Sequence, residues 1–291
     1  MAQQKTTSKS CEMDLYSEMS FQTSRLVTQT YSTSFSIAVR FLPEEMRRAI
    51  FSLYGFVRLS DEIVDTFGSI DQKNTLEDFE RQLDRAMKDG ISINPVLHSF
   101  ALTVSKYAIP ADLIDSFLKS MKADLEKQVY ASDDELREYI YGSAEVVGLM
   151  CLKVFVNGDK PLYEALEKPA IKLGSAFQKV NFLRDLRSDV ELLNRTYFPS
   201  FDIHSFNEAV KNELIDSIRA DFDDAYQGLV RLPGKSKLAV YIAYSYYRQL
   251  LKKLKYTPAS RLMNQRIRVS DPAKMVLLFN AWLRYSLRLI N

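Results

Sequence analysis

Apolar side chains recur about every 3.6 residues along almost the whole chain, a period typical of α-helices that bury one face. No run shows the alternation of apolar and polar residues that indicates a β-strand. Helix breakers are few, because the 291 residues include only nine glycines and nine prolines. The sequence therefore predicts an all-α protein with helices near residues 12–31, 44–66, 73–89, 94–106, 111–129, 133–156, 160–192, 206–227, 236–254 and 272–289.

No low-complexity linker and no internal repeat divides the sequence, so we expect a single domain over residues 1–291, with a mobile tail over about residues 1–15. Two cysteines are too few for a disulfide framework. No stretch reaches the roughly 18 to 20 uncharged apolar residues of a membrane span, and we expect a cytoplasmic protein. Ser132 with Glu135 predicts a capped helix start, and Asp271 before Pro272 predicts another.

Basic residues are concentrated near the C-terminus. Between Arg248 and Asn291 there are ten basic residues and one acidic residue, whereas the rest of the chain carries 29 basic and 36 acidic residues. This segment could hold the protein peripherally on an anionic membrane surface, or it could form only the solvated faces of the last helices. We expect no nucleic-acid partner.

Two predicted helices carry aspartates four residues apart, a spacing that places them on one helix face. An arc of about 60° on the first helix contains Tyr54, Arg58, Asp61 and Asp65. An arc of about 80° on the second contains Gly174, Gln178, Asn181, Asp185 and Asp189. Glu62 points about 100° away from Asp61 and is not expected to be a primary ligand.

Such faces are most often solvated surface acids. Here the surrounding residues are largely apolar, and burying a charge without a partner is costly. Carboxylate and amide oxygens suit Mg²⁺, which proteins commonly share with the phosphate oxygens of a substrate. We therefore expect the two faces to bind divalent cations and a diphosphate.

A third predicted helix has a face of small and aromatic residues, namely Tyr141, Ala144, Gly148, Cys151 and Phe155. Small residues on one face allow two helices to pack closely. They could also leave a hollow for a long apolar ligand, and aromatic rings around such a hollow would stabilise a carbocation. The composition does not separate these two interpretations.

Five segments, in this order along the chain, resemble the squalene and phytoene synthase family of head-to-head prenyl synthases. They are 34–38 (SFSIA), 54–65 (YGFVRLSDEIVD), 139–150 (YIYGSAEVVGLM), 174–189 with 195–199 (the second acidic motif and RTYFP), and 268–274 with Arg268 and Lys274. The residues of these motifs are most similar to those of bacterial phytoene synthases. Three positions depart from the family pattern, because Glu62, Ser143 and Glu145 replace the aspartate, valine and glycine that are often found there.

The resemblance implies a single-domain isoprenoid synthase-type helical bundle around a central apolar cavity. It implies that Mg²⁺, or Mn²⁺ in its place, is bound by Asp61, Asp65, Asn181, Asp185 and Asp189. The expected catalytic residues are the four aspartates of this set together with Arg58 and Tyr54. The implied substrate-binding residues are Ser34, Phe35, Arg58, Tyr130, Tyr141, Ala144, Val147, Gly148, Gln178, Arg184, Arg195, Tyr197 and Arg268.

The activity implied is prenyl transfer: two geranylgeranyl diphosphates would condense through a cyclopropyl diphosphate to phytoene, releasing diphosphate, in carotenoid biosynthesis. A squalene or dehydrosqualene synthase acting on two farnesyl diphosphates is the main alternative, and only a squalene synthase would need NADPH. A non-enzymatic helical assembly factor of the same fold is a further alternative, although both acidic pairs are intact. A head-to-tail elongation enzyme or a terpene cyclase is a weaker alternative, because the residues around Arg58 and Gln178 resemble those enzymes less.

Overall fold

The computed structural model describes residues 2–127, 129–130, 132–191 and 206–291, with side chains described from residue 13 onward except at 187–191. The described residues form helices and contain no β-strand, as the sequence predicts. They divide into two compact units, Met1–Pro110 and Ala111–Asn291. The expectations of a single domain and of a mobile tail stay predictions.

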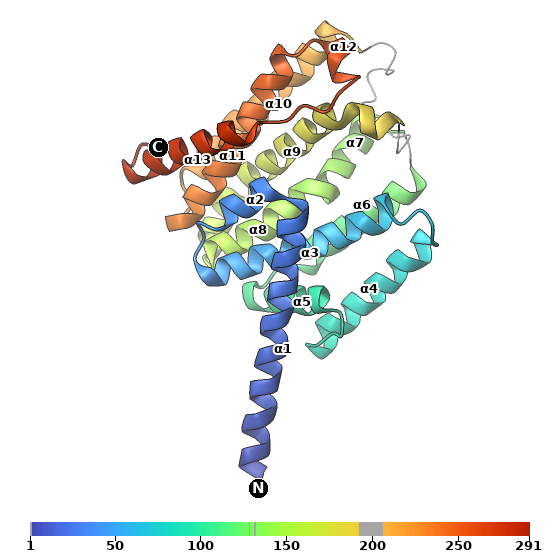
Figure 1. Cartoon of the computed structure of the whole chain (residues 1–291), viewed down its shortest axis with the longest axis vertical. Helices are drawn as coiled ribbons and strands as arrows, with labels where there is room; N and C mark the ends of the chain where they lie inside the picture. Colours follow the sequence, from blue (N-terminus) through green and yellow to red (C-terminus); the bar gives the residue numbers. More distant parts are fainter. Residues whose placement is uncertain (1, 128, 131, 192–205) are drawn as a thin grey trace. The chain divides into compact units, whose positions relative to one another are not determined.

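The first unit consists of five helices (Figure 1): α1 (Ala2–Tyr31), α2 (Thr33–Val39), α3 (Glu44–Asp65), α4 (Gln72–Asp89) and α5 (Pro95–Tyr107). Helix α1 packs against α3 and α5, and α4 packs against the same two helices. The rings of Phe56 and Phe100 stack with their centroids 4.0 Å apart, and the ring of Phe79 stacks on Phe56 with centroids 5.9 Å apart. These buried rings fix the position of α3, which carries the first acidic face.

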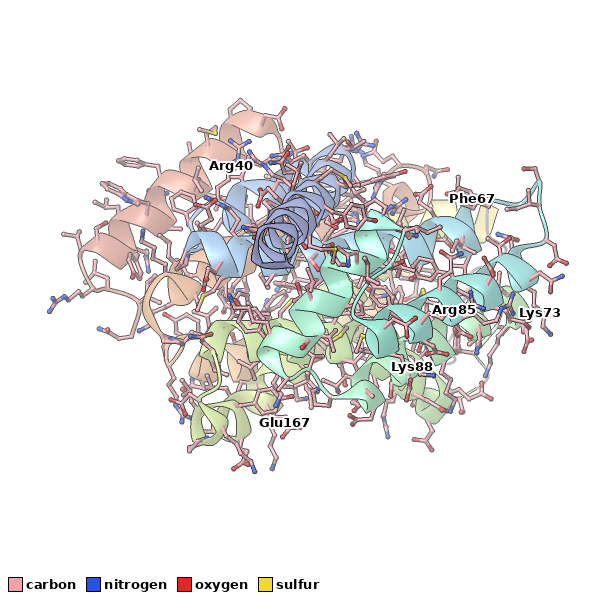
Figure 2. The ribbon with its side chains drawn as sticks, turned by 90° about the horizontal axis from the view of Figure 1, so that it is seen from below. Arg40, Phe67, Lys73, Arg85, Lys88 and Glu167 are labelled. Atoms are coloured by element: carbon pink, nitrogen blue, oxygen red, sulfur yellow. The ribbon has the colours of Figure 1, made fainter. Side chains whose placement is uncertain are left out.

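Helix α4 shows how the sequence pattern becomes structure. The Asp71 carboxylate accepts a hydrogen bond from the Asn74 backbone N–H and caps the helix start. Leu76, Phe79, Leu83 and Ala86 are buried along one side. The opposite side is charged and exposed, and Figure 2 shows Lys73, Arg85 and Lys88 there.

The second unit contains α6 (Ala111–Glu126), α7 (Asp133–Ile140), the π-helical turn η1 (Tyr141–Glu145), α8 (Val146–Val156), α9 (Lys160–Glu191), α10 (Glu208–Leu229), α11 (Gly234–Tyr256), α12 (Ala259–Leu262) and α13 (Asp271–Ser286). The long helix α9 packs against η1, α8, α10 and α11. Because α9 carries the second acidic face, its neighbours determine what surrounds that face.

Glycine allows α9 to approach η1 closely. A Cβ atom at position 174 would lie 2.8 Å from the carbonyl oxygen of Ala144 and 2.9 Å from the Cα of Glu145. At Gly148, a Cβ atom would lie 3.2 Å from the carbonyl oxygen of Ala170. Close helix packing therefore explains the glycines at 148 and 174.

Most of the predicted helices are confirmed, with ends that differ by a few residues, except that the first helix begins at Ala2 rather than near residue 12. The short helices α2 and α12 were not predicted, because an apolar period cannot be recognised over so few residues. The Ser132 hydroxyl accepts from the Glu135 N–H at 3.2 Å, as expected. The prediction of Asp271 as an N-cap is wrong by one residue, since Ser270 occupies that position and Asp271 begins the helix.

One helix among the described residues, Asp133–Val156, is long and apolar enough to cross a membrane by length and composition, and half of its most apolar window is buried. It comprises α7, η1 and α8, and it contains the charged residues Glu145 and Lys153. Within the second unit, η1 and α8 pack against α9. These contacts are those of a core helix.

Replacing Gly174 by alanine should destabilise the protein, because the new methyl group would meet backbone atoms of η1 that cannot rotate away. We expect a loss of about 1–3 kcal/mol in the free energy of unfolding, measured by urea denaturation. Gly68→Ala is the matched control, since a Cβ there meets nothing within 4 Å. Equal stability of the two variants would contradict the close packing of η1 and α9.

Candidate functional site

The first acidic face lies on α3 in the first unit. Asp61 is partly buried, and Asp65, the last residue of the helix, is exposed. Tyr54 and Arg58 are also partly buried on this helix. The face therefore presents two carboxylates near one helix end, beside a cationic and an aromatic side chain.

Arg58 is held in place from two sides. Its guanidinium pairs with the carboxylate of Glu62, one turn later on α3, and lies over the ring of Tyr31 with 4.2 Å between the guanidinium carbon and the ring centroid. Its Nε is buried and has no acceptor among the described residues. One N–H of this fixed cation is thus available to an anionic ligand.

Glu62 departs from the family pattern, and its contact explains what it does. The residue is 7% exposed and its carboxylate pairs with the guanidinium of Arg58. The expectation that Glu62 is not a primary ligand stays a prediction. Its pairing with Arg58 was not predicted.

The aromatic residues predicted in this unit also meet. The rings of Phe35 on α2 and Tyr54 on α3 stack with centroids 5.1 Å apart. Ser34 is half-buried on the same short helix. The SFSIA segment therefore lies within helix α2, which places Phe35 beside Tyr54 of α3.

The second acidic face lies on α9 in the second unit. Two guanidinium groups bind the carboxylate of Asp185 on this face. Arg184 donates from Nε and a terminal nitrogen to Asp185, with distances of 2.5–3.1 Å. Arg266 approaches from the segment between α12 and α13, with its Nε 2.7 Å from Asp185 Oδ1. Arg184 and Asp185 are mostly buried, with 17% and 19% of their side chains exposed. The carboxylate therefore lies between two cationic groups.

Asn181, one turn before Asp185, is oriented by Tyr247. The Tyr247 hydroxyl donates to Asn181 Oδ1 at 3.3 Å, and its ring stacks on Phe177 with centroids 4.0 Å apart. Burial raises the pKa of Tyr247, so this hydroxyl stays a neutral donor. Neither Tyr247 nor Arg266 was predicted as a site residue.

The predicted substrate-binding residues on η1 and α8 lie near this face. Gln178 contacts the hydroxyl of Ser143 at 3.5 Å. Ala144, Val147 and Gly148 are partly buried, and Tyr141 is exposed. Burial raises the pKa of the Cys151 thiol to about 12, which makes this cysteine a poor nucleophile.

Tyr130 is almost completely buried in the second unit. Its ring lies 4.8 Å from that of Tyr139, measured between centroids, and the ammonium of Lys127 lies 5.1 Å from its centroid. The structure therefore describes Tyr130 as a packed aromatic residue. Its predicted role as a hydrogen-bond donor to substrate stays a prediction.

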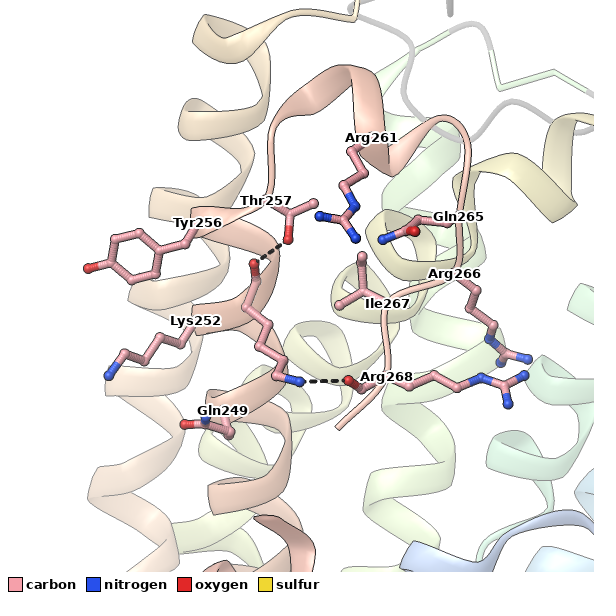
Figure 3. Close-up of a pocket in the computed structure, with 10 residues that line it drawn as sticks. Gln249, Lys252, Tyr256, Thr257, Arg261, Gln265, Arg266, Ile267 and Arg268 are labelled. Carbon is pink, nitrogen blue, oxygen red and sulfur yellow. Dashed lines mark hydrogen bonds between the residues drawn. The ribbon is translucent and has the colours of Figure 1, made fainter. Parts of the chain in front are cut away.

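A pocket of about 420 Å³ lies beside the end of α11 and the segment that follows α12. Figure 3 shows Lys252, Arg261, Arg266 and Arg268 among its labelled residues. The residues that line it include no carboxylate. The side chains of Arg266 and Arg268 extend to the same side (Figure 3), so the pocket connects the basic C-terminal segment with the cation that binds Asp185.

A second polar cluster is formed by residues of η1, α9 and α10. Asp221 on α10 is 5% exposed and accepts from Lys172 at 2.8 Å and from Lys179 at 2.6 Å. Glu145 bonds to Ser175 and interacts electrostatically with the two lysines. Burial raises the pKa of Glu145 in spite of these favourable partners.

The described residues contain no group of three or more His, Cys, Asp or Glu side chains that could hold a metal ion. The side chain of Asp189, and the whole of Arg195 and Tyr197, lie outside the described residues. Asp61 and Asp65 belong to one unit, and Asn181 and Asp185 to the other. Each unit therefore offers a pair of oxygen-bearing side chains of the kind that Mg²⁺ prefers, next to arginines suited to phosphate.

A sequence model described as squalene/phytoene synthase matches residues 28–272. The chain belongs to the squalene/phytoene synthase family. Enzymes of this family act on prenyl diphosphates and generally depend on divalent metals, and the chain is a prenyltransferase. The match extends from α1 to the start of α13 and includes both acidic faces.

Individual proteins agree with the family. The chain is 29% identical to a 15-cis-phytoene synthase of Synechocystis over 92% of its own length and 86% of that protein. It is 26% identical to a 4,4'-diapophytoene synthase of Staphylococcus haemolyticus, over 68% of each. A crystal structure of a dehydrosqualene synthase with a ligand superposes with a TM-score of 0.80 at 21% identity, covering 93% of this chain and 98% of that one. This last likeness shows the shared all-α isoprenoid synthase fold.

Removing the Tyr247 hydroxyl should reduce turnover without unfolding the protein. In Tyr247→Phe the stacking on Phe177 remains, but Asn181 loses the donor that orients it, and we expect kcat to fall about tenfold. Steady-state kinetics and thermal unfolding measure the two effects. Tyr246→Phe is the control, since Tyr246 touches the edge of the Tyr247 ring. If both variants turn over equally, the Tyr247 hydroxyl does not position the site.

Replacing Glu145 by glutamine should stabilise the protein at neutral pH. Burial raises the pKa of Glu145 in the folded state, so the ionised carboxylate opposes folding once the pH rises above the ordinary pKa of a glutamate. The stability that Glu145→Gln gains over the natural protein should therefore be present at pH 7. It should disappear as the pH falls below that ordinary pKa. Urea unfolding at both pH values measures it, and a pH-independent difference would contradict the assignment.

Proposed function

We propose that this prenyltransferase condenses two geranylgeranyl diphosphates head to head, through a cyclopropyl diphosphate intermediate, to phytoene in carotenoid biosynthesis. The observation that carries the proposal is the similarity to a phytoene synthase over 92% of the chain. Both acidic faces lie inside the matched region. The proposal includes a cytoplasmic location and peripheral contact with an anionic membrane, because a long hydrocarbon product partitions into lipid.

The reaction begins when the carbon–oxygen bond of one substrate breaks and its electron pair leaves with the diphosphate. When bound, Mg²⁺ would neutralise the charge that develops on that leaving group. Asp61, Asp65, Asn181, Asp185 and Asp189 are the proposed ligands, and Mn²⁺ could replace Mg²⁺.

Arginines supply the other positive charges. Arg58 is fixed by Glu62 and Tyr31, and its free N–H suits a phosphate oxygen. A cation that is already oriented stabilises a developing anion without reorganisation. Arg184, Arg195 and Arg268 are proposed to contact the diphosphates in the same way, with Tyr54 and Tyr197 as neutral donors.

The allylic cation must then meet the second prenyl chain before water reaches it. Ser34, Phe35, Tyr141, Ala144 and Val147 are proposed to border the apolar space that excludes water. Aromatic faces such as that of Phe35, which stacks on Tyr54, also stabilise nearby positive charge. Loss of a proton from the final cation gives phytoene.

A dehydrosqualene or squalene synthase that uses two farnesyl diphosphates is the second candidate. The similarity to a 4,4'-diapophytoene synthase supports it, although that similarity covers only 68% of the chain. A squalene synthase would need NADPH, whereas phytoene and dehydrosqualene synthases would not. A non-enzymatic assembly factor is no longer a candidate, because the family of the chain is one of prenyltransferases.

Product analysis separates these activities. The purified chain with Mg²⁺ should convert geranylgeranyl diphosphate to phytoene, at a rate that NADPH does not change, and chromatography with mass spectrometry identifies the product. Farnesyl diphosphate should react at least about tenfold more slowly in kcat/KM. A preference for farnesyl diphosphate would refute the phytoene assignment, and a need for NADPH would indicate squalene synthesis.

Substitution of the aspartates tests the proposed ligands. Asp61→Asn keeps the size of the side chain and removes its charge, so kcat should fall at least about 100-fold while the midpoint of thermal unfolding changes little. Asp115→Asn, at an exposed position of α6, is the matched control and should retain full activity. Activity in Asp61→Asn close to that of the control would exclude Asp61 as a ligand.

A further inference from the structure

Helix α13 is apolar on two opposite faces. One face packs against α11 and includes Ala281, which is 2% exposed. The other face is open to solvent and is formed by Met275, Val276, Phe279, Trp282 and Leu283, which span an arc of about 120°. These five residues are called the outer face of α13 below. Between 38% and 60% of each one is exposed.

An exposed apolar face of this kind is unusual on a soluble protein and typically marks an interaction site. Helix α4 shows the ordinary arrangement, with Lys73, Arg85 and Lys88 on its solvent side. On α13 the solvent side instead carries the rings of Phe279 and Trp282, with centroids 6.1 Å apart.

The charge around the outer face indicates what covers it. Arg284 and Arg288 are exposed near the end of the helix, and Lys274 pairs with the single acidic residue of the segment, Asp271. Ten basic residues and one acidic residue lie between Arg248 and Asn291. A second copy of the chain would bring this positive charge against itself across a symmetric interface. An anionic lipid surface would neutralise it.

We propose that α13 is a membrane-docking helix that lies in the plane of an anionic bilayer surface with its outer face in the lipid. Tryptophan, phenylalanine and leucine on one face, bordered by arginine, are the composition of an interfacial helix. The apolar residues supply insertion, and the basic residues supply attraction to anionic headgroups. This proposal rests on the membrane contact included in the proposed function and names the surface that makes it, but it does not depend on which prenyl diphosphate is the substrate.

The chain contains one tryptophan, Trp282, so intrinsic fluorescence reports directly on the outer face. The full chain is mixed with vesicles of phosphatidylcholine alone or of equimolar phosphatidylcholine and phosphatidylglycerol. With the anionic vesicles, the emission of Trp282 should shift to shorter wavelength and be quenched by lipids brominated in the acyl chain. Added salt should weaken the binding, because part of it is electrostatic.

Two variants distinguish insertion of this face from other adhesion. Phe279→Glu places a charge on the outer face and should weaken vesicle binding at least about tenfold. Ile93→Glu makes a comparable change at a residue that is 96% exposed in the first unit and should leave binding unchanged. Circular dichroism checks that both variants keep the helical content of the natural chain.

Three results would overturn the proposal. The chain could fail to sediment with either kind of vesicle, or it could sediment while Trp282 remains unquenched, which would assign the contact to another surface. It could also form a dimer that Phe279→Glu dissociates, with no vesicle binding, and the outer face would then bind a second copy. None of these readouts uses turnover, so a negative result would remove the proposed membrane contact of α13 and leave the proposed reaction untouched.

Discussion

A charged side chain that is mostly buried in an apolar helical protein needs a partner of opposite charge, and at Asp185 this requirement organises the second acidic face. Two guanidinium groups meet its carboxylate, one from the preceding residue and one from the segment after α12. Taking a carboxylate and its guanidinium partner out of water is costly unless the geometry of the ion pair is good. The cluster therefore fixes α9, Arg184 and the C-terminal segment relative to one another. It also keeps carboxylate oxygen atoms and guanidinium groups in one place.

The helix packing around α9 makes this arrangement rigid. Gly174 and Gly148 let η1 and α8 approach the backbone of α9, and the stacked rings of Phe177 and Tyr247 fill the side toward α11. A hydrogen bond from Tyr247 then orients Asn181. Preorganised polar groups of this kind suit a reaction whose main demand is stabilisation of a leaving diphosphate. In the first unit, Tyr31 and Glu62 do the same for Arg58.

The helices and the acidic faces could be predicted because both depend on a period within one segment. Aspartates four residues apart lie on one face whatever surrounds the helix. The partners of those aspartates could not be predicted in this way. Tyr247 lies 66 positions from Asn181, and Arg266 lies 81 positions from Asp185, so only the tertiary fold brings them together. The same limit explains why the small residues at 144 and 148 left close packing and a ligand hollow as open alternatives.

The proposed function requires that the aspartates of α3 and α9 bind the same metal–diphosphate assembly. A crystal structure of the full chain with Mn²⁺ and an unreactive prenyl thiodiphosphate tests it most directly, because anomalous scattering locates the metal independently of the protein. The account predicts Mn²⁺ ions bound by Asp61 or Asp65 and by Asn181 or Asp185, all touching the same diphosphate groups, with Arg58 donating to a phosphate oxygen. Metal and diphosphate bound away from either aspartate pair would contradict it.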